Sequence, residues 1–274
     1  MGGMQAKIAR LDSRAVIRIE GAEWRPFLHN LLTHDIEGLA PGALRFAALL
    51  TPQGKFLHDM FVLAGENEAW LDVQAAHRDA LLKRLTLYKL RAKVGLEPED
   101  AGVFALWDAA DPGAGWTADP RLPQLGFRAI AAGESANATE DDYDAHRLAQ
   151  GVPDPARDCI PDKTFPIEAN FDLLNGIDFR KGCFIGQETT SRMKRRGAIR
   201  TRMLPLVFDG PPPPPGAEVL AGSLRAGEVL SGRQGRAMAL LRLDRIEGAE
   251  LTVDSRAVRA DPPFWFPAWV AAEP

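Results

Sequence analysis

The most informative stretch of the chain reads Arg180-Lys181-Gly182-Cys183-Phe184-Ile185-Gly186-Gln187-Glu188. Glycines on both sides of the cysteine allow the backbone to turn tightly and another molecule to approach the thiol. Helix-forming residues follow, so a helix is predicted from about Gln187 to Arg196. A thiol just before a helix N-terminus, with Lys181 two residues away, is expected to have a lowered pKa. Cys183 is therefore a candidate nucleophile or metal ligand; the alternative is a buried, inert cysteine in a glycine-bounded turn.

The same region is strongly basic. Between positions 180 and 202 there are eight basic residues and one acid, Glu188, in a chain whose net charge is −4. The eight are Arg180, Lys181, Arg192, Lys194, Arg195, Arg196, Arg200 and Arg202. A basic strip on an acidic body indicates an anionic ligand or partner, with a solvated helix face as the alternative. Only Phe184 in the strip could stack on a base, which weakens the case for an RNA-binding surface.

Length and composition describe an ordinary globular protein. The chain has 274 residues, of which 46% are hydrophobic and 26% charged, enough for two domains or for one large and one small domain. No stretch of 18 apolar residues occurs, which excludes a membrane span. Two cysteines, Cys159 and Cys183, cannot build a disulfide framework or a four-ligand metal site. We therefore expect a reducing, cytoplasmic location.

Hydrophobic periodicity predicts an α+β protein with antiparallel sheets. Apolar residues at helical spacing predict helices over 24–32, 77–90 and 141–150, whereas alternation predicts strands over 15–19, 44–50, 55–63, 69–73, 92–96, 103–107 and 126–131. The stretch 152–179 has little periodicity. Five prolines, Pro211–Pro215, predict a stiff spacer before a run of short strands typical of a small β-barrel. The predicted domains are 1–200, with two lobes, and 201–274, the barrel.

Three parts of the chain together resemble one known family. They are Arg147-Leu148-Ala149-Gln150-Gly151-Val152-Pro153, Pro166-Ile167-Glu168-Ala169-Asn170 and the run from Lys181 to Glu188. The chain resembles the folate-binding YgfZ family, which is related to the glycine-cleavage T-protein (aminomethyltransferase) and includes mitochondrial iron–sulfur assembly factors. The family signature K-G-C-[YF]-x-G-Q-E is matched in full. The turn Thr51-Pro52-Gln53-Gly54-Lys55 and the proline-rich bridge to a barrel also look like this family.

The resemblance implies a fold and a function. The implied fold is a ring of aminomethyltransferase-like lobes around a tetrahydrofolate channel. The implied function is the assembly or repair of iron–sulfur proteins, of the [4Fe–4S] type, with client or carrier proteins as partners. Cys183 and Lys181 would be the reactive pair. Since one cysteine cannot hold a cluster alone, Cys183 would be a transient ligand shared with a partner, and no resident metal is expected.

The resemblance also implies a folate site, for tetrahydrofolate or a one-carbon derivative. Carboxylates and amides suit the pterin, while basic groups suit the glutamate tail. The candidate contacts are Glu168, Asn170, Gln187, Glu188, Asp59, Arg147 and Arg196. In relatives the segment near position 147 reads R-x-E-x-G, but the acidic position is Ala149 here. We therefore expect Glu168 to substitute for that carboxylate, or folate to bind more weakly.

Two other functions stay open at this point. A folate-dependent aminomethyltransferase would use Asp59 as a charge partner or base, although His58 replaces the acidic neighbour found in the T-protein. An RNA-binding or tRNA-modification accessory module would use the basic strip. Neither a membrane nor a nucleic acid is the expected partner, and the sequence does not decide whether the protein turns over a substrate by itself.

Overall fold

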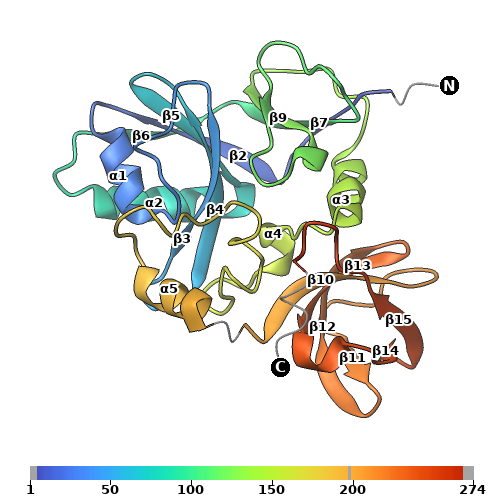
Figure 1. Cartoon of the computed structure of the whole chain (residues 1–274). Coiled ribbons are helices and arrows are strands. Elements are labelled where there is room, and N and C mark those ends of the chain that lie inside the picture. Colours follow the sequence, from blue (N-terminus) through green and yellow to red (C-terminus); the bar gives the residue numbers. More distant parts are fainter. Residues whose placement is uncertain (1–4, 197–198, 268–274) are drawn as a thin grey trace.

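The computed structural model describes residues 5–196 and 199–267. Its strands form two open sheets and one closed barrel, which give the molecule three lobes (Figure 1). The strands of each sheet pair antiparallel. The predicted α+β class, with antiparallel sheets and a small C-terminal barrel, is therefore confirmed.

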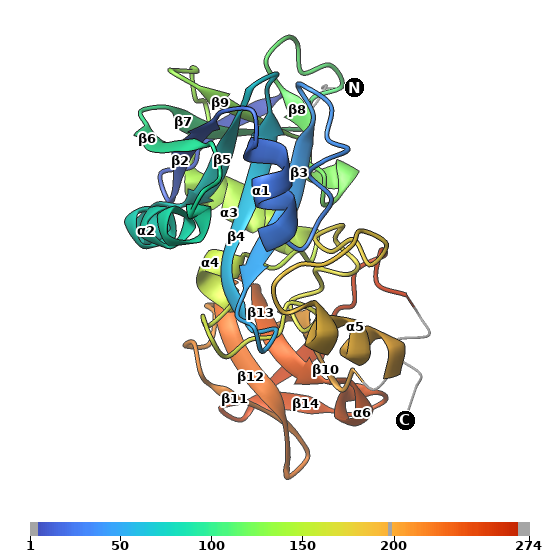
Figure 2. The ribbon, with the colours of Figure 1, turned by 90° about the vertical axis from the view of Figure 1, so that its left-hand side faces the viewer.

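The first lobe is a five-stranded sheet with the order β3-β4-β5-β2-β6. Its strands are β2 (Arg14–Glu20), β3 (Leu44–Leu50), β4 (Phe56–Ala64), β5 (Glu68–Gln74) and β6 (Gly95–Glu99). Residues of β3 are almost all buried, because alternate side chains point to opposite faces and each face meets a core. Helices α1 (Trp24–Leu31) and α2 (Arg78–Lys89) contribute to the core on one face (Figure 2).

The second lobe is a smaller sheet with the order β1-β7-β9-β8. Its strands are β1 (Lys7–Arg10), β7 (Gly102–Trp107), β8 (Thr117–Ala118) and β9 (Phe127–Ala131). Helix α3 (Glu140–Ala149) starts with a capping box, in which the Thr139 hydroxyl accepts from the Asp142 amide and the Asp142 carboxylate accepts from the Thr139 amide. Tyr143 packs against Trp107 of the sheet, so the first turns of α3 are fixed against this lobe.

An irregular segment connects α3 to the barrel. It contains α4 (Pro155–Asp158) and then no further helix or strand until α5 (Gln187–Arg196), whose bounds match the predicted helix. Phe171 of this segment stacks on Phe46 of β3, with the ring centroids 4.7 Å apart. The segment thus buries its apolar residues against the second face of the five-stranded sheet, although they follow neither helical nor strand spacing in the sequence.

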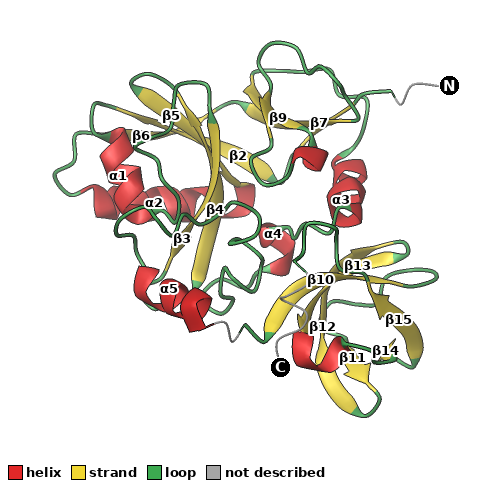
Figure 3. Ribbon diagram, in the orientation of Figure 1, coloured by secondary structure: helices red, strands yellow, loops and turns green. Residues whose placement is uncertain are grey.

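The C-terminal lobe is a closed six-stranded barrel with the order β10-β13-β12-β11-β14-β15 (Figure 3). Its elements are β10 (Thr201–Val207), β11 (Glu218–Ala221), β12 (Leu224–Arg233), β13 (Arg236–Arg242), α6 (Leu243–Ile246), β14 (Leu251–Val253) and β15 (Arg256–Ala260). The prediction that Pro211–Pro215 form a spacer before the barrel is wrong. Strand β10 precedes the prolines and pairs with β13 and β15. The prolines therefore belong to the loop that connects two strands of the barrel, β10 and β11.

Candidate functional site

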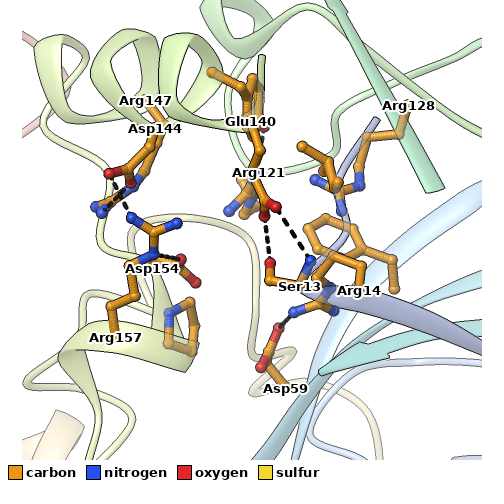
Figure 4. A pocket seen from close by; sticks show the side chains of 14 residues that line it. Ser13, Arg14, Asp59, Arg121, Arg128, Glu140, Asp144, Arg147, Asp154 and Arg157 are labelled. Carbon is orange, nitrogen blue, oxygen red and sulfur yellow. Dashed lines mark hydrogen bonds and ion pairs between the residues drawn. The ribbon is translucent and has the colours of Figure 1, made fainter. Parts of the chain in front are cut away.

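A charged pocket lies between the two open sheets, α3 and α4 (Figure 4). Its lining residues are Leu11, Ser13, Arg14, Asp59, Phe61, Arg121, Arg128, Glu140, Tyr143, Asp144, Arg147, Asp154, Pro155 and Arg157. The cavity between these side chains is small, about 40 Å³. A ligand larger than a few atoms therefore requires the lining side chains to move apart.

One wall of the pocket is a buried network of ion pairs. The guanidinium of Arg14 lies 2.8 Å from the carboxylate of Asp59 and 2.6 Å from that of Asp72. Asp72 also binds Arg128, at 2.6 Å. Burial alone raises the pKa of Asp72, but Arg128 and Arg14 bring it below its ordinary value. Burial alone lowers the pKa of Arg14, but Asp59 and Asp72 raise it above its ordinary value. Asp72 and Arg14 are therefore charged at neutral pH, and their ion pairs hold them in place.

The opposite wall is centred on Asp144 of α3. Its carboxylate accepts from Arg147 at 2.7 Å, from Arg157 of α4 at 2.6 Å and from Arg233 of β12 at 2.6 Å. Burial raises the pKa of Asp144, but Arg147 and Arg157 bring it below its ordinary value. One carboxylate thus connects α3, α4 and the barrel beside the pocket.

Glu140 differs from the other acids of the pocket. Its carboxylate accepts from the hydroxyl of Ser13 and, at 3.2 Å, from the Ser13 backbone amide (Figure 4). Within residues 5–196 and 199–267, no Lys or Arg makes an ion pair with Glu140, whereas Asp59, Asp144 and Asp154 each have an arginine partner. Glu140 is therefore the pocket carboxylate best placed to accept N–H groups of a ligand.

Of the predicted folate contacts, the structure brings only Asp59 and Arg147 into this pocket. Asp59 is 1% exposed, and it also accepts from Gln74 at 2.7 Å. Arg147 donates to the Val152 carbonyl at 2.9 Å as well as to Asp144. Both side chains thus already make hydrogen bonds to neighbouring groups of the protein.

Glu168 and Asn170, two further predicted folate contacts, do not line this pocket. The Glu168 carboxylate accepts from the Phe165 amide at 2.9 Å and from the Thr201 hydroxyl at 2.7 Å. The Asn170 amide donates to the Met203 carbonyl at 2.7 Å, and its backbone has a positive φ of 60°. Their hydrogen bonds join the irregular segment to the start of β10. The substitution of Glu168 for the acid missing at position 149 stays a prediction.

The remaining predicted contacts also lie away from the pocket. Gln187 donates to the Gly182 carbonyl at 3.1 Å, which closes the signature loop on itself, and Glu188 is exposed on α5. Arg196 ends α5, and its side chain lies outside the described part of the structure. The basic strip is not one surface either. Arg202 is fully buried against Asp172, and Lys194 also pairs with Asp172, at 2.8 Å.

The ammonium of Lys181 holds the end of α1, and its predicted effect on the Cys183 thiol stays a prediction. Its ammonium donates to the backbone carbonyls of His29 and, at 2.7 Å, of Leu32. These carbonyls belong to the last turn of α1, where backbone acceptors lack partners within the helix and attract a cation. Burial lowers the pKa of Lys181 to about 8. The lysine of the signature therefore anchors the loop to the first lobe.

The two glycines of the signature have different roles. A Cβ atom at Gly182 would meet nothing within 4 Å, so that position is open. At Gly186, which has a φ of +82°, it would lie 2.6 Å from the Thr51 carbonyl oxygen and 2.8 Å from the Cα of Gly54. The turn Thr51–Gly54 between β3 and β4 therefore packs directly on the signature loop. Two of the motifs that support the family resemblance, the signature loop and this turn, therefore contact each other in the structure.

The two cysteines occupy opposite environments. Cys183 is exposed in the loop before α5, whereas Cys159 is buried. Burial, followed by the nearby charge of Asp158, raises the pKa of the Cys159 thiol well above its ordinary value. Only Cys183 of the two is therefore accessible to a partner. No group of three or more His, Cys, Asp or Glu side chains in the described ranges is arranged to hold a metal ion.

Comparison with known proteins identifies the family. The mitochondrial iron–sulfur cluster assembly factor IBA57 of Homo sapiens is 33% identical over 301 residues, which cover 94% of this chain and 85% of that protein. The chain belongs to the IBA57 family of iron–sulfur cluster assembly factors. The Mus musculus IBA57 is 31% identical over 304 residues, with the same two coverages of 94% and 85%. The predicted relation to iron–sulfur assembly factors is confirmed, while the narrower YgfZ label stays a prediction.

The same comparisons establish the fold family. The crystal structure of the glycine cleavage system aminomethyltransferase T from Bartonella henselae superimposes with a TM-score of 0.78 at 18% identity, covering 96% of this chain and 86% of that chain. Residues 200–268 match the family described as the CAF17 C-terminal beta-barrel domain. This IBA57-family chain therefore has an aminomethyltransferase-like fold with a C-terminal barrel.

One prediction is contradicted by these relatives. Two cysteines, too few for a disulfide framework, suggested a cytoplasmic protein, but the human and mouse relatives are named as mitochondrial. The cytoplasmic prediction is therefore wrong as judged by the family, whose named members point to mitochondria.

Proposed function

We propose that this chain assists iron–sulfur cluster assembly by offering Cys183 as a transient cluster ligand. The observation that carries the proposal is the exposure of this one thiol in a loop that is fixed at both ends, by Lys181 and by Gly186. A single thiolate leaves further coordination positions of the iron to other ligands. The partner that supplies those ligands would be an iron–sulfur carrier or client protein, consistent with the names of the relatives.

The proposal includes a reduced folate, tetrahydrofolate or a one-carbon derivative, bound in the charged pocket. The donor set fits this class of ligand: a carboxylate can accept the N–H groups of a pterin, and arginines pair with the carboxylates of a glutamate tail. Glu140 is the pocket acceptor that has no ion-pair partner among the described residues, and Arg157 is a partly exposed arginine at the pocket. When bound, the folate would supply a one-carbon carrier. The side chains around it would bind and orient it once they have moved apart.

The aminomethyltransferase alternative has less support from the pocket. Its predicted base, Asp59, is almost completely buried and holds both Arg14 and Gln74. A general base must be free to take a proton from the substrate. Asp59 instead has the geometry of a group that positions Arg14, so we do not propose turnover of an amine donor.

The test is a deletion of the encoding gene followed by activity assays of several [4Fe–4S] enzymes. We expect these activities to fall, to return with the wild-type chain, and not to return with Cys183→Ser. Cys159→Ser is the matched control, because it removes the buried thiol, and it is expected to restore activity. Normal [4Fe–4S] activities in the deletion strain, or full rescue by Cys183→Ser, would overturn the proposal.

A further inference from the structure

The C-terminal end of α2 carries an exposed apolar and basic surface that the proposed function does not use. Leu87 is 75% exposed and Leu90 is 88% exposed. The other large apolar side chains found exposed in the described ranges lie singly, at positions 160, 224 and 264. Leu87 lies in the last turn of α2 and Leu90 directly follows its last residue, so both exposed leucines lie at the end of the helix.

The sequence of α2 explains why these leucines face outward. Leu81 and Leu85, four residues apart, are buried in the core of the first lobe, together with the partly buried Leu82 and Tyr88. Residues three or four apart share a helix face, so Leu87 falls on the side opposite to Leu81 and Leu85. The helix therefore already has a complete inward face, and its outward leucines add nothing to the core.

Basic residues lie within four positions of the two leucines in the sequence. Lys83, Arg84 and Arg91 are exposed, and in the part of the chain that the structure describes none of them makes an ion pair. Lys89 and Lys93 are close by, but they border a groove that also contains Glu20 and Glu68. The three exposed side chains that make no ion pair therefore give this end of α2 its positive charge. In Figure 2, α2 lies at the outer edge of the first lobe, away from the barrel.

We propose that this end of α2, comprising Lys83, Arg84, Leu87, Leu90 and Arg91, binds the surface of an anionic phospholipid bilayer. Leucines that project from a helix end, rather than lining a groove, suit a deformable lipid interface better than a protein partner, which needs a matching pocket. Surrounding Lys and Arg side chains are attracted to anionic headgroups while the leucines enter the acyl boundary. The surface is thus charge-complementary to such a bilayer.

This surface places the chain on a membrane without crossing it. Within residues 5–196 and 199–267, no helix is long and apolar enough to span a bilayer. The sequence pattern excluded a span, and from it we expected no membrane partner, but contact through a few side chains needs no long apolar stretch. The inference is independent of the folate pocket and of Cys183, whose residues are all elsewhere in the chain.

The experiment is co-sedimentation of the full chain with vesicles of phosphatidylcholine alone or with about 30% phosphatidylserine. We expect binding only to the anionic vesicles, weakening as salt rises. Lys83→Glu combined with Arg84→Glu should reduce this binding by at least about tenfold, since each basic residue near the surface contributes roughly fivefold. Leu87→Gln combined with Leu90→Gln should also reduce it severalfold, and because both side chains are exposed, the fold should persist.

Two control variants make the result specific. Leu224→Gln removes an exposed leucine of the barrel, and Arg192→Glu with Arg195→Glu reverses exposed charges on α5. Both are expected to bind anionic vesicles as the wild type does. No binding to anionic vesicles at low salt, equal binding to neutral vesicles, or equal losses in the controls would overturn the proposal. If the chain did not bind anionic vesicles at low salt, an acidic protein would become the better candidate for this surface.

Discussion

Replacing Asp72 by Asn tests whether the buried ion pairs of the pocket stabilise the protein. The Asp72 carboxylate has a side-chain exposure of 2% and binds Arg14 and Arg128, which are 7% and 5% exposed. The variant keeps the shape but leaves the positive charge of the two arginines under-compensated in a buried site. Removing one partner of a buried pair costs about 3–5 kcal/mol, so we expect the free energy of unfolding to fall by that amount.

Urea unfolding at neutral pH measures this loss. Asp244→Asn is the control, because it breaks an ion pair with Arg242 that has similar geometry, at 2.7 Å, but lies on the surface. An exposed pair contributes about 0–1 kcal/mol. A loss below about 1 kcal/mol for Asp72→Asn, or one equal to the control, would refute the reasoning, because it would show that the network is not effectively buried.

The pH dependence of the wild type provides a second measurement if the Asn variant does not fold. Because the folded-state pKa of Asp72 is lowered, its contribution is fully present above the unfolded pKa of about 3.9. This contribution is lost as pH falls from there towards the folded pKa. We therefore expect the wild type to lose stability below about pH 4 and to lose none from this group between pH 5 and 8.

Three further predictions concern the pocket and the signature loop. Glu140→Gln should weaken tetrahydrofolate binding, measured by calorimetry, by about 1.5–3 kcal/mol, whereas Glu168→Gln should leave it unchanged; the reverse result would return the pterin contact to Glu168. A limiting thiol reagent at neutral pH should label Cys183 well before Cys159, and mass-spectrometric mapping that finds Cys159 labelled first would contradict the assignment. Lys181→Met should destabilise the fold by about 1–3 kcal/mol but change the labelling rate of Cys183 by less than about threefold; a tenfold fall would show that the lysine does tune the thiol.

Local pattern was sufficient for most of the fold. The alternation around Ala15–Ile19, the helical spacing from Trp24 and the helix-forming run from Gln187 each predicted an element that the structure contains. The prolines at 211–215 led to the wrong prediction of a spacer before the barrel, because a stiff segment can connect two strands of one barrel as well as two domains. The strand β10 before them contains Pro205 and has little alternation, so it was not predicted as a strand, although the predicted barrel domain 201–274 includes it.

The pocket could not be predicted in the same way. Its charged residues come from segments far apart in the chain: Arg14 opens β2, Asp59 lies in β4, Arg128 in β9 and Asp144 in α3. Each, taken alone, resembles an ordinary surface charge, and only the tertiary fold shows that they neutralise one another in a buried site. The cluster of acids at the start of α3, followed by Arg147, was the one local signal, and it also fits a capped helix.

Lys181 and Gly186 show why the signature has its spacing. Lys181 fixes the front of the loop to the carbonyls that end α1, and Gly186 lets the back of the loop contact the turn Thr51–Gly54. Between these two anchors, Cys183 stays exposed on a loop that is not free to move far. That turn leads directly into β4, which carries Asp59 of the charged pocket. The signature loop therefore packs on the same hairpin, β3 and β4, that carries one acid of the pocket.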